Sequence, residues 1–164
     1  MHIDREDVDP VVNANALLYL GESPDTLPAI HFIIDTVLHE PAAWSLYYED
    51  ILTLYYAVAR AFRHSSPRLS ALGEHIVARI HERGEGPERL NPLQAAMAAS
   101  ALLTFDSTSG LPANLLHLIL DAQRADGGWK TYPFYKVWGS EELTTGFCLE
   151  VLARCRQMKA ESPT

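Results

Sequence analysis

Two acidic residues near the beginning of the chain, Asp7 and Asp9, lie two positions apart and precede Pro10. An aspartate followed by proline is typical of a helix start, where the carboxylate accepts hydrogen bonds from free backbone N–H groups and its ionised form is favoured. A general acid instead needs burial or a second carboxylate to keep it protonated, and Asp7 is the neighbour that would do this for Asp9. Asp9 is therefore interpreted either as a helix cap or as an acid in a polar pocket. Asn13, one turn later, would line the same pocket or be a buried, satisfied amide.

Ten of the fifteen aromatic residues fall in two short segments of the chain, 44–56 and 129–138. They are Trp44, Tyr47, Tyr48, Tyr55, Tyr56, Trp129, Tyr132, Phe134, Tyr135 and Trp138. Such rings can shape an apolar cavity and stabilise a cation through their negative faces, or they can pack a core or a protein interface. Adjacent residues on a helix point about 100° apart, so the two Tyr-Tyr pairs cannot bury all their rings on one narrow stripe. At least two of these four tyrosines are therefore expected to face a cavity or another subunit.

The remaining groups that bind metals or act as nucleophiles show no spacing typical of a site. His31, Asp35 and His39 share one helix face, but the outer two would lie about 12 Å apart, so we expect a solvated face. Cys148 and Cys155 would lie about 10 Å apart on a helix and are expected to be small core residues. No glycine-rich phosphate loop, Gly-x-Ser-x-Gly elbow or His-Glu-x-x-His motif occurs in the sequence. The sequence predicts neither a metal nor a cofactor.

The composition of the chain excludes several classes of partner. Of its 164 residues, 48% are apolar and 21% are charged, which is ordinary for a globular protein. The net charge of −8 would repel nucleic acid and anionic membranes over most of the surface, so neither is an expected partner. No apolar run approaches the roughly 20 residues of a membrane span, and polar residues stand where a signal peptide has its apolar core. We therefore expect a single cytoplasmic domain, residues 1–164.

Apolar residues recur every three to four positions in seven stretches, and no sustained alternation predicts a strand. The fold is therefore predicted to be all-α. The expected helices span residues 10–20, 27–39, 46–63, 67–82, 92–105, 112–123 and 140–157. Three of the starts are marked by a polar residue before proline, at Asp9, Ser66 and Asn91, and Gln94 is placed to complete a capping box.

The connection after the sixth expected helix begins with Gln123-Arg124-Ala125-Asp126-Gly127-Gly128-Trp129. This segment resembles the Gln-Trp repeat, Gln-x-x-Asp-Gly-x-Trp, of the terpenoid cyclase and protein prenyltransferase superfamily. The glycines permit a tight exit from the helix, and the glutamine and tryptophan can stack and tie neighbouring helix pairs together. The repeat is structural in that superfamily. The resemblance therefore implies stacked antiparallel helix pairs, as in a partial α/α-toroid, and no catalytic residue.

The segment Asp7-Val8-Asp9-Pro10 resembles part of the Asp-x-Asp-Asp motif of class II terpene cyclases, with Pro10 in place of the fourth acid. In those enzymes the middle aspartate protonates an alkene or epoxide. The resemblance implies a small cyclase or isomerase of an isoprenoid or other apolar alkene, started by proton transfer from Asp9 with Asp7 assisting. The substrate-binding residues would be Asn13, Trp44, Tyr48, Tyr55, Tyr56 and Trp138. The alternative is a non-catalytic helical-repeat protein that binds an apolar ligand or a partner chain.

The number of expected helices leads to a prediction about assembly. A closed toroid of the resembled superfamily uses about twelve helices, whereas seven are expected here, and stacked repeats without caps leave apolar faces uncovered. We therefore expect a homo-oligomer, or a partner chain that completes the helical ring, with the tyrosine pairs near the shared surface.

Overall fold

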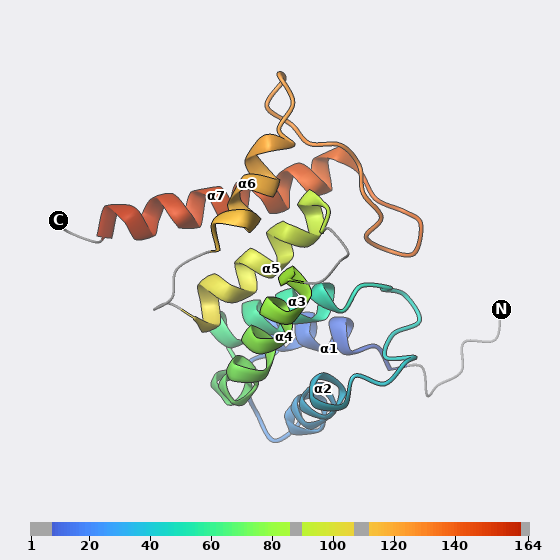
Figure 1. Ribbon diagram of the computed structural model, residues 1–164. Helices are drawn as coiled ribbons and strands as arrows, with labels where there is room; N and C mark the ends of the chain where they lie inside the picture. Colours follow the sequence, from blue (N-terminus) through green and yellow to red (C-terminus); the bar gives the residue numbers. More distant parts are fainter. Residues whose placement is uncertain (1–7, 86–89, 107–111, 162–164) are drawn as a thin grey trace.

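The computed structural model describes residues 8–85, 90–106 and 112–161. Within these ranges the chain is all-helical, as predicted, with seven α-helices, one 3₁₀ helix and no strand. The elements are α1 (Pro10–Leu20), α2 (Leu27–His39), α3 (Ile51–His64), η1 (Pro67–Leu72), α4 (Gly73–Glu85), α5 (Pro92–Phe105), α6 (Ala113–Asp121) and α7 (Glu141–Glu161). Figure 1 shows α3 and α5 at the centre, with α1 and α2 on one side and α6 and α7 on the other.

Three helices, α1, α2 and α5, have the predicted bounds, and local capping explains two of them. The Asp9 carboxylate accepts hydrogen bonds from the N–H groups of Val11 and Val12 at the start of α1. At the start of α5, Asn91 and Gln94 form the predicted capping box, with both reciprocal bonds present. These signals are local, so the sequence alone determines where the two helices begin.

The predicted start of the third helix at residue 46 is wrong, because α3 begins at Ile51. The Ser45 hydroxyl accepts the N–H groups of Tyr47 and Tyr48, which turns the chain there instead of continuing a helix. Asp50 then caps α3 by accepting the N–H of Leu52.

The predicted helix 67–82 is divided into η1 and α4. Pro67 opens a short 3₁₀ segment, a common form of the first turns of a helix, and the α-helix proper begins at Gly73. The ends of α6 and α7 also differ from the predicted ends, by one to four residues, which is the usual uncertainty of a helix end.

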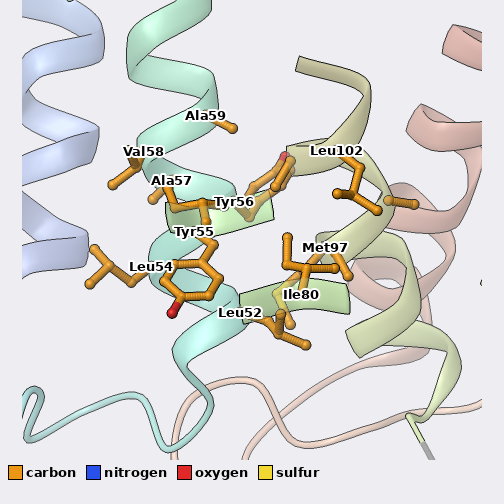
Figure 2. Packing of buried hydrophobic residues seen from close by; sticks show 14 of the residues in the cluster. Leu52, Leu54, Tyr55, Tyr56, Ala57, Val58, Ala59, Ile80, Met97 and Leu102 are labelled. Carbon is orange, nitrogen blue, oxygen red and sulfur yellow. The ribbon is translucent and has the colours of Figure 1, made fainter. Parts of the chain in front are cut away.

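The core is built around α3 and α5, whose side chains are buried on almost every face. Figure 2 shows Leu54 and Val58 pointing from α3 toward α1, while Tyr56 and Met97 lie between α3 and α5. Five buried alanines of α5 leave room for neighbouring helices to approach closely: Ala95, Ala96, Ala98, Ala99 and Ala101. α5 and the first part of α3 are apolar on nearly all faces, which is typical of helices at the centre of a bundle.

The loop that resembles the Gln-Trp repeat ties α6 to α7 through Trp129. Its fully buried indole Nε1 donates to the carbonyl oxygen of Ile119 at 2.7 Å, and its backbone N–H donates to Thr145 Oγ1 at 3.1 Å. Gly127 has a φ of +85°, a backbone conformation that glycine adopts without strain. Gln123 is exposed and donates from Nε2 to the Gly127 carbonyl oxygen. The tie between the two helices is therefore made mainly by the tryptophan.

The thiols are unpaired in the described part of the chain and lie on α7. Cys148 is buried, and burial raises the pKa of its thiol to about 12. Cys155 is half-buried, and its pKa is also raised by burial. None of the described helices combines the length and the hydropathy that a membrane crossing requires.

Candidate functional site

An open groove lies where two long connections meet on one side of the helices. One connection joins α2 to α3 and the other joins α6 to α7, and Figure 1 shows both reaching toward the same side. The groove has a volume of about 630 Å³. It is lined by Ala42, Trp44, Ser45, Leu46, Tyr47, Tyr48, Glu49, Lys136, Val137 and Trp138, and we call it the aromatic groove. It brings together residues from both aromatic segments of the sequence.

Stacked rings connect the two walls of the groove. The rings of Tyr47 and Tyr135 are parallel, with centroids 5.7 Å apart, and Tyr48 meets Tyr135 edge-on at 6.0 Å. The backbone N–H of Lys136 donates to the Tyr47 carbonyl oxygen at 3.0 Å. Aromatic pairs in these geometries contribute about 0.5–1.5 kcal/mol each beyond their buried area. The two connections are therefore in direct contact with each other.

The same rings continue from the groove into the core. Tyr48 packs edge-on against Phe134 at 5.5 Å, Phe134 contacts Phe147 of α7 at 5.5 Å, and Phe147 contacts Tyr56 of α3 at 4.7 Å. Burial raises the pKa of the Tyr48 hydroxyl, and the nearby Asp9 carboxylate raises it further. The inner wall of the groove, formed by Tyr48, is thus packed onto the bundle. The outer wall, formed by Val137 and Trp138, is exposed.

A tight turn places the outer wall. Tyr135 and Trp138 pair across the turn, and Lys136 between them has a φ of +50°. The Lys136 ammonium lies over the faces of Tyr47 and Tyr135, 5.7 and 5.9 Å from their centroids. Val137 and Trp138 follow, with 78% and 71% of their surface exposed, and Leu46 opposite them is 61% exposed. The outer wall of the groove is therefore apolar and open to solvent, and the lining of the groove contains one cation, Lys136, and one carboxylate, Glu49.

Asp9 is buried beneath the groove, with 5% of its surface exposed. Its Oδ1 accepts the N–H groups of Val11 and Val12 at 2.9 and 3.0 Å, and its Oδ2 accepts the Ser45 hydroxyl at 2.5 Å. Because Ser45 Oγ already accepts two backbone N–H groups, its proton is directed to Asp9. Three donors thus face the carboxylate, an arrangement that serves a helix cap and a loop anchor. Asp7, the predicted assisting acid, lies outside the described residues.

The other predicted site residues divide into those at the groove and those elsewhere. Trp44, Tyr48 and Trp138 line it. Asn13 is half-buried and donates from Nδ2 to the Asp9 carbonyl oxygen at 2.9 Å. Tyr55 and Tyr56 are buried in the core, as Figure 2 shows, and their hydroxyls donate to Glu40 and Glu150. Two of the four paired tyrosines, Tyr47 and Tyr48, therefore face the groove, in a loop and not on a helix.

Ser45 and Lys136 line the groove but are not predicted from the sequence. Ser45 precedes Tyr47 and Tyr48 by two and three residues and accepts the backbone N–H groups of both. This spacing is a local turn signal, but the aromatic residues beside it draw attention away from the serine. Lys136 carries no such signal, because only the fold places it over the tyrosine rings. His31, Asp35 and His39 do not form a metal site, and within the described residues no cluster of His, Cys, Asp or Glu does.

Two acidic clusters anchor the ends of the connection that carries Trp44 to Tyr48. At its beginning, Glu40 accepts hydrogen bonds from Arg79 at 2.7 and 3.1 Å and from the Tyr55 hydroxyl. At its end, Asp50 accepts from Arg83 at 2.9 Å and from Gln94. Both clusters join the connection to helices of the bundle, so the position of the groove wall depends on them.

The Glu40 cluster gives an expected pH dependence of stability. The hydrogen bonds from Arg79 lower the pKa of Glu40 below its ordinary value of 4.5, against the opposing effect of burial. Its ionised form therefore stabilises the fold above about pH 4.5, and this contribution is lost as the pH falls through the lower folded-state pKa. Glu40→Gln is expected to lower the free energy of unfolding at pH 7 by about 1 kcal/mol, the upper end for a partly exposed ion pair. Urea denaturation at a series of pH values measures this.

The difference between the wild type and Glu40→Gln should shrink as the pH falls from 4.5 through the lowered pKa of Glu40, because the protonated carboxyl is uncharged like the amide. Glu49 is an exposed glutamate of the same connection, so Glu49→Gln serves as the matched control. This variant should change the free energy of unfolding little at any pH. A Glu40→Gln effect that is constant from pH 7 to pH 3 would contradict the assignment.

Comparisons with protein-family models, with curated proteins and with solved structures gave no match for this chain. The resemblance to terpenoid cyclases therefore stays a prediction that depends on the two motifs quoted above.

Proposed function

We propose that this chain is a binding protein that holds an apolar ligand with a flat aromatic or unsaturated body in the aromatic groove. The observation that carries the proposal is the meeting of two aromatic-rich connections around a groove of about 630 Å³. This volume falls in the range of about 300–1,000 Å³ that small-molecule sites occupy. A flat ligand can stack on Trp44, Tyr48 or Trp138, and an acidic group on it can pair with Lys136.

A proton-initiated cyclase or isomerase of an isoprenoid is the second candidate. The observation in its favour is that Asp9 is buried and hydrogen-bonded to Ser45, which lines the groove. Two features favour binding over this reaction. The Asp9 oxygens are occupied by three donors, and the exposed outer wall does not exclude water from a reactive cation.

The experiment is a fluorescence titration of the full chain with anilinonaphthalene sulfonate, a flat aromatic probe with one anionic group. We expect saturable binding, and Trp138→Ala is expected to weaken it by at least tenfold. Loss of a large anchor residue costs about 2 kcal/mol, and 1.4 kcal/mol corresponds to a factor of ten. Tyr19→Ala is the matched control, because Tyr19 is an exposed aromatic residue (88%) on α1 outside the groove.

Equal affinities for Trp138→Ala, Tyr19→Ala and the wild type would overturn the proposal. Light scattering of the same samples tests the predicted homo-oligomer: a dimer that dissociates in Trp138→Ala would mean that a second copy occupies the groove instead of a ligand. Incubation with geranylgeraniol tests the second candidate. A cyclic product formed by the wild type and absent with Asp9→Asn would favour the enzyme.

A further inference from the structure

A second cavity, of about 490 Å³, lies on a different part of the molecule. It is formed where the C-terminal ends of α3 and α5 meet the second half of α7. Its lining residues are Phe62, Arg63, Leu103, Thr104, Arg154, Gln157 and Met158. None of them lines the aromatic groove, so the two sites are separate.

Two guanidinium groups supply the charge of this cavity. Arg154 has only 12% of its side chain exposed, and it donates to the carbonyl and hydroxyl oxygens of Ser100 and to Thr104 Oγ1, all uncharged acceptors. Arg63 is exposed, and the described residues give it no carboxylate partner. The cavity therefore carries positive charge in a chain whose net charge is −8.

One carboxylate lies near these arginines, but it is engaged elsewhere. Glu150 Oε1 is 4.0 Å from Arg154 and accepts a hydrogen bond from the Ser100 hydroxyl at 3.2 Å. Its Oε2 accepts the Tyr56 hydroxyl at 2.7 Å. One acid at the limit of ion-pair distance leaves the charge of two arginines incompletely balanced.

Apart from Thr104 and Gln157, the rest of the wall is apolar. Phe62 stacks on Phe105 with centroids 5.1 Å apart, and Leu103 and Met158 complete the apolar surface. A wall that combines two cations with apolar side chains is complementary to a molecule with an anionic head and an apolar body.

The electrostatic surroundings of Arg154 agree with a site for an anion. Burial lowers the pKa of Arg154, and the neighbouring positive charge of Arg63 lowers it further. Both effects disfavour the charged guanidinium, and an anion bound between the two arginines would offset them.

We propose that this cavity binds an amphipathic anion, with a carboxylate or phosphate head on Arg63 and Arg154 and an apolar body against Phe62, Leu103 and Met158. Arginine suits this role because its planar fork matches two oxygens of either head group. The proposal is independent of the aromatic groove and of what the groove binds.

Calorimetric titration of the full chain tests the proposal with four probes: decanoate, decyl phosphate, decanol and acetate. Decanoate, decyl phosphate or both should bind with a stoichiometry of one. Decanol lacks the charge and acetate lacks the apolar body, so each should bind at least tenfold more weakly. The preferred head group distinguishes a fatty acid from a phosphorylated lipid.

Arg63→Gln should weaken binding of the preferred probe by at least tenfold, and because Arg63 is exposed this variant is expected to fold normally. Arg156→Gln is the matched control, since it removes one exposed arginine from α7 outside the cavity and should leave affinity unchanged.

Equal binding of decanol and decanoate, or an unchanged affinity in Arg63→Gln, would overturn the proposal. Failure of every probe to bind would also overturn the proposal, and holding the end of α5 would be the role left to Arg154. Loss of decanoate binding in Trp138→Ala but not in Arg63→Gln would place the anion in the aromatic groove and likewise overturn it.

Discussion

Replacing Trp129 with alanine is expected to lower the free energy of unfolding by about 3–5 kcal/mol, the range for truncating a buried aromatic side chain. The indole is fully buried and lies between α6 and α7. Its removal leaves a cavity and also leaves the Ile119 carbonyl oxygen without the donor at 2.7 Å. Urea denaturation followed by far-ultraviolet circular dichroism measures the change without depending on tryptophan fluorescence.

Two further variants separate the contributions of burial and of the hydrogen bond. Trp129→Phe retains most of the apolar volume but lacks the N–H donor, so it should fall between the wild type and Trp129→Ala. Trp138→Ala removes the same kind of side chain from an exposed position and should change stability by less than about 0.5 kcal/mol. Equal losses in Trp129→Ala and Trp138→Ala would contradict the role of Trp129 as the tie between the helices.

The parts of the fold that were predictable from the sequence are those determined by neighbouring residues. The starts of α1 and α5 follow from Asp9 and from the Asn91–Gln94 box, each of which acts within one helical turn. The predicted start of α3 at residue 46 is too early, because Leu46, Tyr47 and Tyr48 extend the apolar pattern of the helix toward its N-terminal side. The Ser45 turn overrides that pattern.

The candidate sites were harder to predict because their parts come from distant segments. The aromatic residues that line the groove were evident in the sequence, but the contact between Tyr47 and Lys136 joins segments 89 positions apart, and no local pattern encodes it. Tyr55 and Tyr56 look equivalent to Tyr47 and Tyr48 in sequence. The fold separates them because a central helix buries both faces on which they lie.

The cavity lined by Arg63 and Arg154, which we call the arginine cavity, was not predictable from the spacing of charges. Arg154 follows Glu150 by four positions, a spacing typical of an exposed ion pair on a helix surface. In the structure its guanidinium points to the backbone and hydroxyl groups of α5 and lies 4.0 Å from Glu150. Burial of a charged side chain depends on the packing of a neighbouring helix, which the spacing of charges does not report.

The second large effect is expected at Gly139, where the connection between α6 and α7 crosses its own backbone. A methyl group at this position would overlap the Tyr132 carbonyl oxygen and would lie 2.9 Å from the carbonyl carbon. Because these are backbone atoms, Gly139→Ala must push the backbone segments at Gly139 and Tyr132 apart. We expect a loss of about 1–3 kcal/mol in the free energy of unfolding, as for other overpacked positions.

Replacing Gly146 with alanine should change the free energy of unfolding in the opposite direction. Gly146 lies within α7 and is exposed, and a methyl group there would contact nothing within 4 Å. Alanine is favoured over glycine inside a helix by about 0.5–1 kcal/mol, so Gly146→Ala should stabilise the fold. Comparison of Gly139→Ala with Gly146→Ala therefore distinguishes a steric clash from a general effect of replacing glycine.

Gly139→Ala should also weaken binding of anilinonaphthalene sulfonate, because the displaced segment carries Val137 and Trp138 of the groove wall. Binding of decanoate at the arginine cavity should be unchanged, since that cavity is built from α3, α5 and α7 alone. If Gly139→Ala matched Gly146→Ala in stability and kept full affinity for the aromatic probe, the close crossing at Tyr132 would not constrain the groove. If it lost both ligands, the connection would support the packing of the whole bundle and not the groove alone.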